Sequence, residues 1–139
     1  MTAGAAEVDG QRRPDSVSAT PAEAASERTS YRSIGPRMVK LLNERRTELG
    51  LKPVLYSADE QRKADACARE NLTAWHHCGH EVLAKGERPQ DMSAEKLLDG
   101  WFDSPAHREA LTRPSSRIAG AAVVTDDRGI YVAALAIDY

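Results

Sequence analysis

Three of the four histidines of this chain lie within five residues. His76, His77 and His80 are followed at once by Glu81, and His107 lies further downstream. An imidazole titrates near neutral pH, so it can transfer a proton or bind a metal ion. A carboxylate beside the ring can orient it or, when desolvated, act as a general base. These residue types indicate proton transfer, hydrolysis or ligand binding at one site, with His77 as the ring that we expect to face solvent.

The sequence around His107 predicts the start of a short helix. Ser104-Pro105 is typical of an N-cap followed by the first helical residue. His107 then lies in the first helical turn, where the positive end of the helix dipole favours the neutral ring. A nucleophilic role for Ser104 beside it is a further hypothesis, although serine is common at N-caps for structural reasons alone.

The same side chains allow a metal site. A divalent ion such as zinc, held weakly by His76 and His107 beside Glu81, would keep open positions for water. A zinc site that uses the two cysteines is the competing arrangement, although their spacing is not the short paired spacing of structural sites. Its four ligands would be Cys67, His76, Cys78 and His80. The functions considered below require no cofactor, so the metal is optional.

Cys67 and Cys78 are the two cysteines of the chain. A helix from Cys67 to Trp75 rises about 12 Å, and three extended residues return about 10 Å. A disulfide, whose Cα atoms lie about 5.5 Å apart, is therefore feasible if the chain reverses directly after Trp75. In a reducing cytoplasm the pair would stay as thiols. A disulfide and buried thiols are both compatible with the sequence.

Apolar residues at helical spacing predict four helices. Pro36 suits a first helical turn, Ser57 with Glu60 forms a capping box, and Ser93 caps a third helix. The predicted helices cover residues 36–50, 57–75, 93–102 and 104–111, and they bury Trp75, Trp101 and Phe102.

Two apolar segments near the C-terminus predict a β-hairpin. Residues 118–125 and 130–137 are rich in Val, Ile and Ala and are joined by a turn sequence. Both strands are apolar on both faces, so helices should cover each side, and small residues around Gly120 would let one approach closely. Residues 76–91 are expected to be mostly loop, with one helical turn near 81–84. The expected fold is α/β: an α-β-α sandwich in which about four helices flank a small antiparallel sheet.

The N-terminal part is too polar to join this domain. It contains hardly any large apolar side chain, so it cannot bury enough surface to offset its ordering entropy. We expect residues 1–33 to be a disordered polar leader, with a marginal helix over 22–28, and residues 34–139 to be one domain.

The composition excludes several classes of partner. The net charge is −2 with both signs interspersed, and aromatic residues make up only 5%. We therefore expect no nucleic-acid partner. No apolar run is long enough to span a bilayer, and the N-terminus lacks a secretory signal. The sequence as written predicts a cytoplasmic protein, a monomer or weak dimer, whose partner is a small molecule, a lipid or a peptide.

Three segments of the sequence resemble motifs of one family. Residues 76–86 resemble the segment of the CAP superfamily (cysteine-rich secretory protein, antigen 5, pathogenesis-related 1) in which a histidine precedes a Gly-Glu-Asn-hydrophobic-Ala-x-Gly motif. Residues 94–108 are similar to the bacterial form, in which a tryptophan helix leads into Ser-Pro-Gly-His-Arg. Residues 41–46 match the family's Leu-Leu-Asn-x-x-Arg start. The predicted hairpin falls where the family places its last two strands.

The resemblance implies an α-β-α sandwich with a cleft lined by two histidines and acidic residues. Carried over position by position, His76, Glu81 and His107 fill three of the four cleft positions. The fourth falls on Ser104, and we expect Ser104, the neighbouring Asp103 and His80 to line the cleft as binding residues. His80 replaces the motif glycine and adds an imidazole that family members usually lack.

Two functions follow from such a cleft. The first is a binding module that takes a small ligand, of the hydrophobic kind bound by relatives of this fold, or a peptide. The second is an intracellular enzyme in which His76, Glu81 and His107 carry out acid–base or hydrolytic chemistry on a small substrate. Both require the imidazoles of His76 and His107 to meet beside the Glu81 carboxylate. Members of the family are usually secreted, in contrast to the cytoplasmic location expected above.

Overall fold

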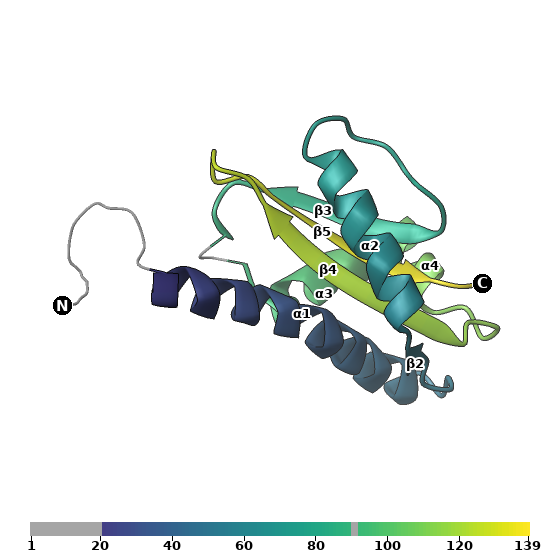
Figure 1. Cartoon of the computed structure of the whole chain (residues 1–139). Helices are drawn as coiled ribbons and strands as arrows, with labels where there is room; N and C mark the ends of the chain where they lie inside the picture. Colours follow the sequence, from purple (N-terminus) through teal and green to yellow (C-terminus); the bar gives the residue numbers. More distant parts are fainter. Residues whose placement is uncertain (1–20, 90–91) are drawn as a thin grey trace. The chain divides into compact units, whose positions relative to one another are not determined.

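The computed structural model describes residues 21–89 and 92–139, and residues 31–139 form one compact unit. Most of the predicted leader, residues 1–20, lies outside the described residues, so the domain boundary stays a prediction. The helices are α1 (Pro21–Glu48), α2 (Ala58–Asn71), α3 (Ala94–Phe102) and α4 (Pro105–Leu111). The strands are β2 (Leu55–Tyr56), β3 (Glu81–Gly86), β4 (Ile118–Thr125) and β5 (Tyr131–Ile137) (Figure 1).

The sheet is built on the predicted hairpin. β4 and β5 pair antiparallel from Ala119 opposite Ile137 to Thr125 opposite Tyr131. β3 adds antiparallel to the other edge of β5, and β2 pairs parallel with β4, so the order is β2-β4-β5-β3 and the sheet is mixed. The predicted helical turn over 81–84 is wrong, because this segment is part of β3. The edge of β5 supplies its hydrogen-bond partners, which a six-residue segment cannot reveal through its own periodicity.

Alternate side chains of the sheet enter two separate cores. Val123 packs with apolar residues of α1, α3 and α4, whereas Val124 packs with residues of α2. Figure 1 shows α2 on one face of the sheet and α3 and α4 on the other. A Cβ on Gly120 would overlap the backbone of Gln61 in α2, so the glycine permits the close approach that the sequence predicted. The α-β-α sandwich is confirmed.

Two helix limits differ from the prediction. α1 begins at Pro21 and continues through Pro36, because the Ala, Glu and Arg residues before Pro36 favour a helix. α2 ends at Asn71 instead of near Trp75. Trp75 is therefore 56% exposed and does not join the core. The other two predicted core aromatic residues, Trp101 and Phe102, are buried.

Two polar residues of α1 hold the helix to its neighbours. Arg46 is fully buried, and its guanidinium donates through Nε to Lys52 O at 2.9 Å and through Nη1 to Leu111 O at 2.9 Å. Burial lowers the pKa of this guanidinium below its ordinary value. Asn43 exchanges two hydrogen bonds with the backbone of Val54. These two residues of the resembled family motif therefore join α1 to the following link and to the end of α4.

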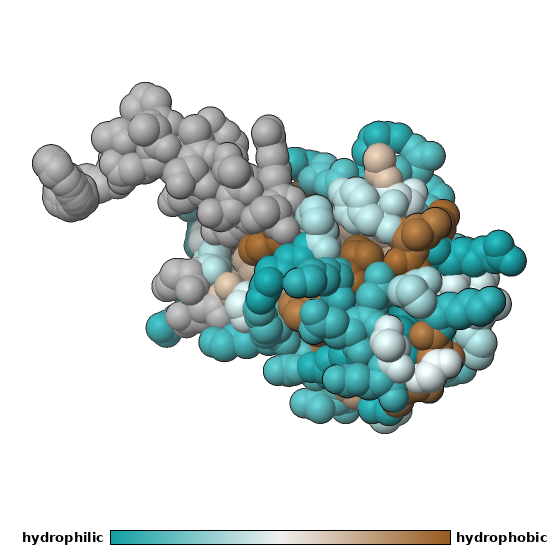
Figure 2. Space-filling model, turned by 90° about the horizontal axis from the view of Figure 1, so that it is seen from below, coloured by the Kyte–Doolittle hydropathy of each residue, from teal (hydrophilic) through white to brown (hydrophobic). Residues whose placement is uncertain are grey.

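Apolar side chains outside the core are scattered. The face in Figure 2 is mainly hydrophilic and carries several separate hydrophobic patches. Isolated apolar residues on a surface are normal and require no partner. Among the described helices, none combines the length and apolar character that a membrane span needs.

Candidate functional site

Glu81 opens β3 and lies on the α2 side of the sheet. Alternation along the strand places it on the same face as Leu83, which packs in the core under α2. Its side chain is only 4% exposed, and a buried carboxylate needs hydrogen bonds. Oε1 accepts from Gly79 N at 2.8 Å, and Oε2 accepts from Cys78 N at 3.2 Å and lies 2.6 Å from His77 Nδ1. The Glu81 carboxylate therefore closes the turn before β3, with His77 as its imidazole partner.

His76 lies beside a different carboxylate. Its Nε2 is 2.9 Å from Glu70 Oε1, and its Nδ1 is 2.9 Å from Ala74 O. The hydrogen bond to Ala74 O, followed by the one to Glu70, raises the pKa of the His76 imidazole above its ordinary value. The Nε2 atom also lies 3.7 Å from Cys78 Sγ. The family resemblance assigned His76 to Glu81, but Glu70 is its hydrogen-bond partner.

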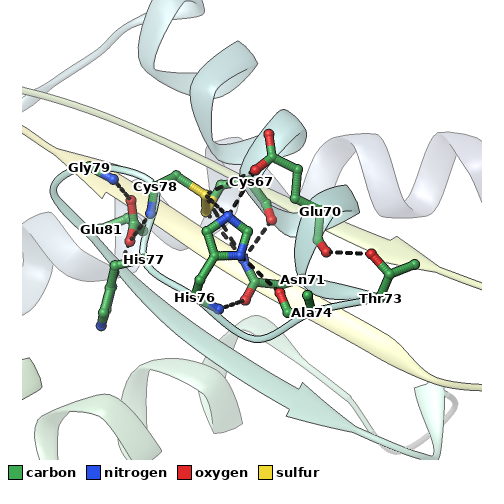
Figure 3. The surroundings of a disulfide bond; sticks show 10 residues. All are labelled: Cys67, Glu70, Asn71, Thr73, Ala74, His76, His77, Cys78, Gly79 and Glu81. Carbon is green, nitrogen blue, oxygen red and sulfur yellow. Dashed lines mark hydrogen bonds and ion pairs between the residues drawn. A yellow bond between two sulfur atoms is a disulfide. The ribbon is translucent and has the colours of Figure 1, made fainter.

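Cys67 and Cys78 form a disulfide with their Cα atoms 5.9 Å apart. The bridge is possible because α2 ends at Asn71, which leaves a longer segment for the return than the sequence predicted. Asn71 is buried and fixes this reversal: its Nδ2 donates to Cys67 O at 2.9 Å, and its Oδ1 accepts from His76 N at 2.7 Å. Figure 3 shows the His76 ring beside both the disulfide and Glu70.

A pocket of about 520 Å³ lies between α2, the loop before β3 and the end of β5. We call it the Glu81 pocket. Of the predicted site residues, Glu81 and His80 line it. His80 is held in place because its Nδ1 lies 2.6 Å from Ile137 O and its ring centroid lies 4.0 Å from that of Tyr139. Among the described residues, the lining consists of Glu60, Lys63, Ala66, Cys67, Glu70, Cys78, Gly79, His80, Glu81, Ala136, Ile137, Asp138 and Tyr139.

The predicted site residues near α4 lie elsewhere. His107 is on α4, whose Leu111 belongs to the core on the opposite face of the sheet from the α2 core. Ser104 is the N-cap of α4 without a side-chain capping bond, and Asp103 is the C-cap of α3. None of these three lines the Glu81 pocket. The contacts described for Glu81 do not include His107, so the predicted meeting of these two residues stays a prediction.

Two groups of metal-ligating side chains occur in the part of the chain that the structure describes. One is Cys67, Cys78 and Glu81, and the other is Glu70, His76 and Cys78; in each group the ligand atoms lie within 4.8 Å of one another. Neither includes His107 or His80. The predicted set of His76 and His107 beside Glu81 is not among these groups of described residues, and neither is the predicted set in which His80 joins the cysteines.

Sequence reasoning missed Glu70 and Asn71. Both lie on α2, three and four residues after Cys67, and residues at these spacings share one face of a helix. The spacing from Cys67 could have indicated both residues, because side chains on the same helix face as Cys67 also lie near the residues that Cys67 contacts.

The three-layer fold and the motif order identify the family of this chain. Residues 39–137 match the description "Cysteine-rich secretory protein family" (CAP). The chain belongs to the CAP family, as the resemblance implied. A search of curated proteins found no match.

Solved structures of low sequence identity share the fold. An outer surface protein from Borrelia burgdorferi aligns with a TM-score of 0.57 at 20% identity, over 72% of this chain and 89% of that one. A cysteine-rich secretory protein from Staphylococcus aureus aligns with a TM-score of 0.53 at 18% identity, over 71% of this chain and 36% of that one. An extracellular protein containing an SCP domain from Bacillus anthracis aligns with a TM-score of 0.54 at 17% identity, over 87% of this chain and 45% of that one.

Proposed function

We propose that this CAP domain binds a small ligand or a short peptide in the Glu81 pocket. The observation that carries the proposal is the pocket itself, whose volume of about 520 Å³ is in the range of small-molecule sites. Ala66, Ala136, Ile137 and the Tyr139 ring provide apolar surface, and Glu81 provides a buried carboxylate. A site with an apolar wall and few polar groups is suited to an amphipathic ligand.

The charges around the pocket favour a ligand that carries a positive group. Four acidic residues line it: Glu60, Glu70, Glu81 and Asp138. Among the lining residues that the structure describes, Lys63 is the one lysine or arginine, and it is paired with Glu60 at 2.9 Å. Desolvation acts to raise the pKa of Asp138, but hydrogen bonds from the backbone of Ile118 and Arg117 outweigh it and lower the pKa. Asp138 therefore stays ionised near neutral pH, and the pocket attracts an amine more strongly than a carboxylate.

The alternative, an acid–base enzyme that uses His76, Glu81 and His107, has weaker support. Both oxygens of Glu81 already accept backbone hydrogen bonds, and His107 lies outside the pocket. Binding in the Glu81 pocket, unlike binding in the cleft that the sequence predicted, uses neither a free base nor His107. The optional zinc ion, the monomeric or weakly dimeric state and the lack of a nucleic-acid partner stay predictions. So does the cytoplasmic location, although the Cys67–Cys78 disulfide favours an oxidising compartment.

A blocking substitution tests the proposal. Ala66 is an exposed residue of α2 at the pocket wall, so Ala66→Trp should fill the pocket and leave the fold intact. Ala106→Trp, at an exposed position of α4 outside the pocket, is the matched control. The probes are a panel of arylalkyl amines and the corresponding neutral alcohols, followed by NMR shifts of the backbone amides.

We expect amines to shift Gly79, His80 and Ala136, which line the pocket. Ala66→Trp should weaken this binding about tenfold or more, which is about 1.4 kcal/mol, whereas Ala106→Trp should not change it. Equal binding by both variants, or shifts centred on α4, would show that the pocket is not the binding site.

A further inference from the structure

We propose that the Cys67–Cys78 disulfide is the closed form of a redox-gated zinc site. After reduction, the ligands are the thiolates of Cys67 and Cys78, Nε2 of His76 and the carboxylate of Glu70. We call these four residues the Cys/His/Glu cluster. This inference does not depend on ligand binding in the Glu81 pocket.

The spacing of three ligand atoms already suits a common ion. His76 Nε2 lies 3.7 Å from Cys78 Sγ and 2.9 Å from Glu70 Oε1, and Cys78 Sγ lies 3.8 Å from Glu70 Oε1. With zinc–sulfur bonds of about 2.3 Å and zinc–nitrogen or zinc–oxygen bonds of about 2.0–2.2 Å, tetrahedral ligand atoms lie about 3.3–3.8 Å apart. Only His76 Nε2 and Glu70 Oε1, which are 2.9 Å apart, must move slightly farther from each other to bind the same ion.

The fourth ligand is withheld by the disulfide. Two thiolates on one zinc ion lie about 3.8 Å apart, so both cannot bind while the sulfurs are bonded to each other. The Cα atoms of Cys67 and Cys78 are 5.9 Å apart. Rotation about the side-chain torsions can therefore separate the freed sulfurs without a change in the backbone. Thiolate, imidazole and carboxylate in a tetrahedral arrangement are a ligand set typical of zinc.

The surrounding hydrogen bonds are those of a supported metal site. His76 Nδ1 lies 2.9 Å from Ala74 O, and a ligating histidine commonly donates its other ring N–H to a backbone carbonyl in this way. Asn71 Oδ1 accepts from His76 N at 2.7 Å, and Asn71 Nδ2 lies 3.4 Å from Cys67 Sγ. Asn71 therefore positions the imidazole and offers a donor to the sulfur. Figure 3 shows these contacts around the disulfide.

Glu70 is a better carboxylate ligand than Glu81. The Glu81 side chain is 4% exposed, and its oxygens accept from two backbone amides and contact His77. The Glu70 side chain is 58% exposed and contacts His76. Recruiting Glu81 would open the turn before β3, whereas recruiting Glu70 only exchanges its imidazole contact for a zinc bond.

The opening step is a thiol–disulfide exchange. A dithiol reductant gives two electrons and two protons to the bridge, so that the bond between the Cys67 and Cys78 sulfurs breaks and the reductant becomes a disulfide. Cys78 is exposed, which gives an attacking thiolate access. Zinc then binds without a change of oxidation state, and the two thiol protons, together with any proton on His76 Nε2, leave to solvent.

Metal titration of the two redox forms tests the proposal. One sample stays oxidised; the other is reduced with a dithiol, desalted under nitrogen and checked by thiol count. Zn²⁺ affinity is measured by competition with a chromophoric chelator, and Co²⁺ reports the ligands through its thiolate charge-transfer and tetrahedral d–d bands. We expect one ion per chain in the reduced form, with an affinity about 100-fold or more above that of the oxidised form.

The variants assign the ligands. In the reduced form, His76→Ala and Glu70→Gln should each weaken zinc binding about tenfold or more, and the matched controls His107→Ala and Glu109→Gln should leave it unchanged. Cys67→Ser should retain a weaker cobalt charge-transfer band from Cys78. Equal affinity in both redox forms would overturn the proposal, as would an effect of His107→Ala equal to that of His76→Ala. Loss of the far-UV circular dichroism of α2 in the reduced, zinc-loaded protein would also overturn it, because the site needs a folded helix.

Discussion

His76 and His77 are neighbours in the chain but contact different carboxylates. The side chain of Asn71 accepts from the backbone N–H of His76 and holds its ring over the end of α2, beside Glu70. The next residue faces the other way and contacts Glu81. Two adjacent histidines therefore pair with two different carboxylates, His76 with Glu70 and His77 with Glu81. This pairing depends on the residue at which α2 ends.

The protonation of His76 depends on the two contacts of its ring. Its pKa is raised by the hydrogen bond to Ala74 O and by Glu70, so the oxidised protein should titrate His76 above the ordinary value of about 6.5. The raised pKa of His76 contributes its full stabilisation when the pH is below the pKa of this histidine in the unfolded chain. The contribution is lost as the pH rises through the higher pKa of His76 in the folded protein. NMR titration of the ring protons measures the pKa of His76 in the wild type and in Glu70→Gln.

Glu70→Gln should move the titration midpoint of His76 toward its ordinary value, because Glu70 is one of the contacts that raise its pKa. The variant should also be less stable than wild type to urea at low pH, with the difference vanishing above the His76 midpoint. An unchanged midpoint in the variant would mean that the contact between His76 and Glu70 does not form in solution.

At the scale of elements, α2 positions both the Glu81 pocket and the Cys/His/Glu cluster. The helix can lie close to β4 because Gly120 has no Cβ that would meet the backbone of Gln61. Its N-terminus is fixed by the Ser57 side chain, which accepts from Glu60 N at 3.2 Å. Any change in the separation of α2 from the sheet would alter the distance between the two walls of the pocket.

Substitution of Gly120 tests this packing. Gly120→Ala should destabilise the protein by about 1–3 kcal/mol, because the added methyl group overlaps helix backbone that cannot move aside easily. Gly100→Ala is the control: Gly100 lies in α3 with open space around it, and the change should stabilise by up to about 1 kcal/mol. Urea denaturation measures both changes. A neutral Gly120→Ala would mean that α2 lies farther from β4 than described.

At the scale of the whole molecule, the disulfide closes a short loop between the end of α2 and the start of β3. The bonded cysteines are separated by 11 positions. Cross-linking a loop of this length is worth about 2–3 kcal/mol in the chain-entropy account. A domain whose total stability is about 5–15 kcal/mol therefore stays folded without the bond.

Reduction should accordingly lower the free energy of unfolding by about 2–3 kcal/mol. Urea denaturation in the presence and absence of a dithiol, with a chelator in both samples, measures this difference apart from any metal binding. The double variant Cys67→Ala/Cys78→Ser should be insensitive to the dithiol. Identical unfolding midpoints for oxidised and reduced wild type would contradict the expected contribution of the bridge.

Local patterns predicted much of the fold. The hairpin of β4 and β5, the capped starts of α2 and α3 and the burial of Trp101 follow from periodicity, capping residues and turn chemistry, all of which act over a few neighbouring positions. The family followed from the order of its motifs. The helical turn predicted over residues 81–84 was wrong, because these residues form a short strand that is stabilised by pairing with β5, which is distant in sequence.

The candidate site depended on tertiary structure. The amino-acid types at positions 76, 81 and 107 indicated acid–base or metal chemistry, but which of them meet depends on the face of β3 that Glu81 occupies and on the residue at which α2 ends. Strand pairing and the Asn71 hydrogen bonds set these two features. Long-range contacts of this kind leave no periodic signal in the sequence. The layers and the residue types could therefore be predicted from local patterns, whereas the pairing of His76 with Glu70 instead of Glu81 depends on how the chain packs.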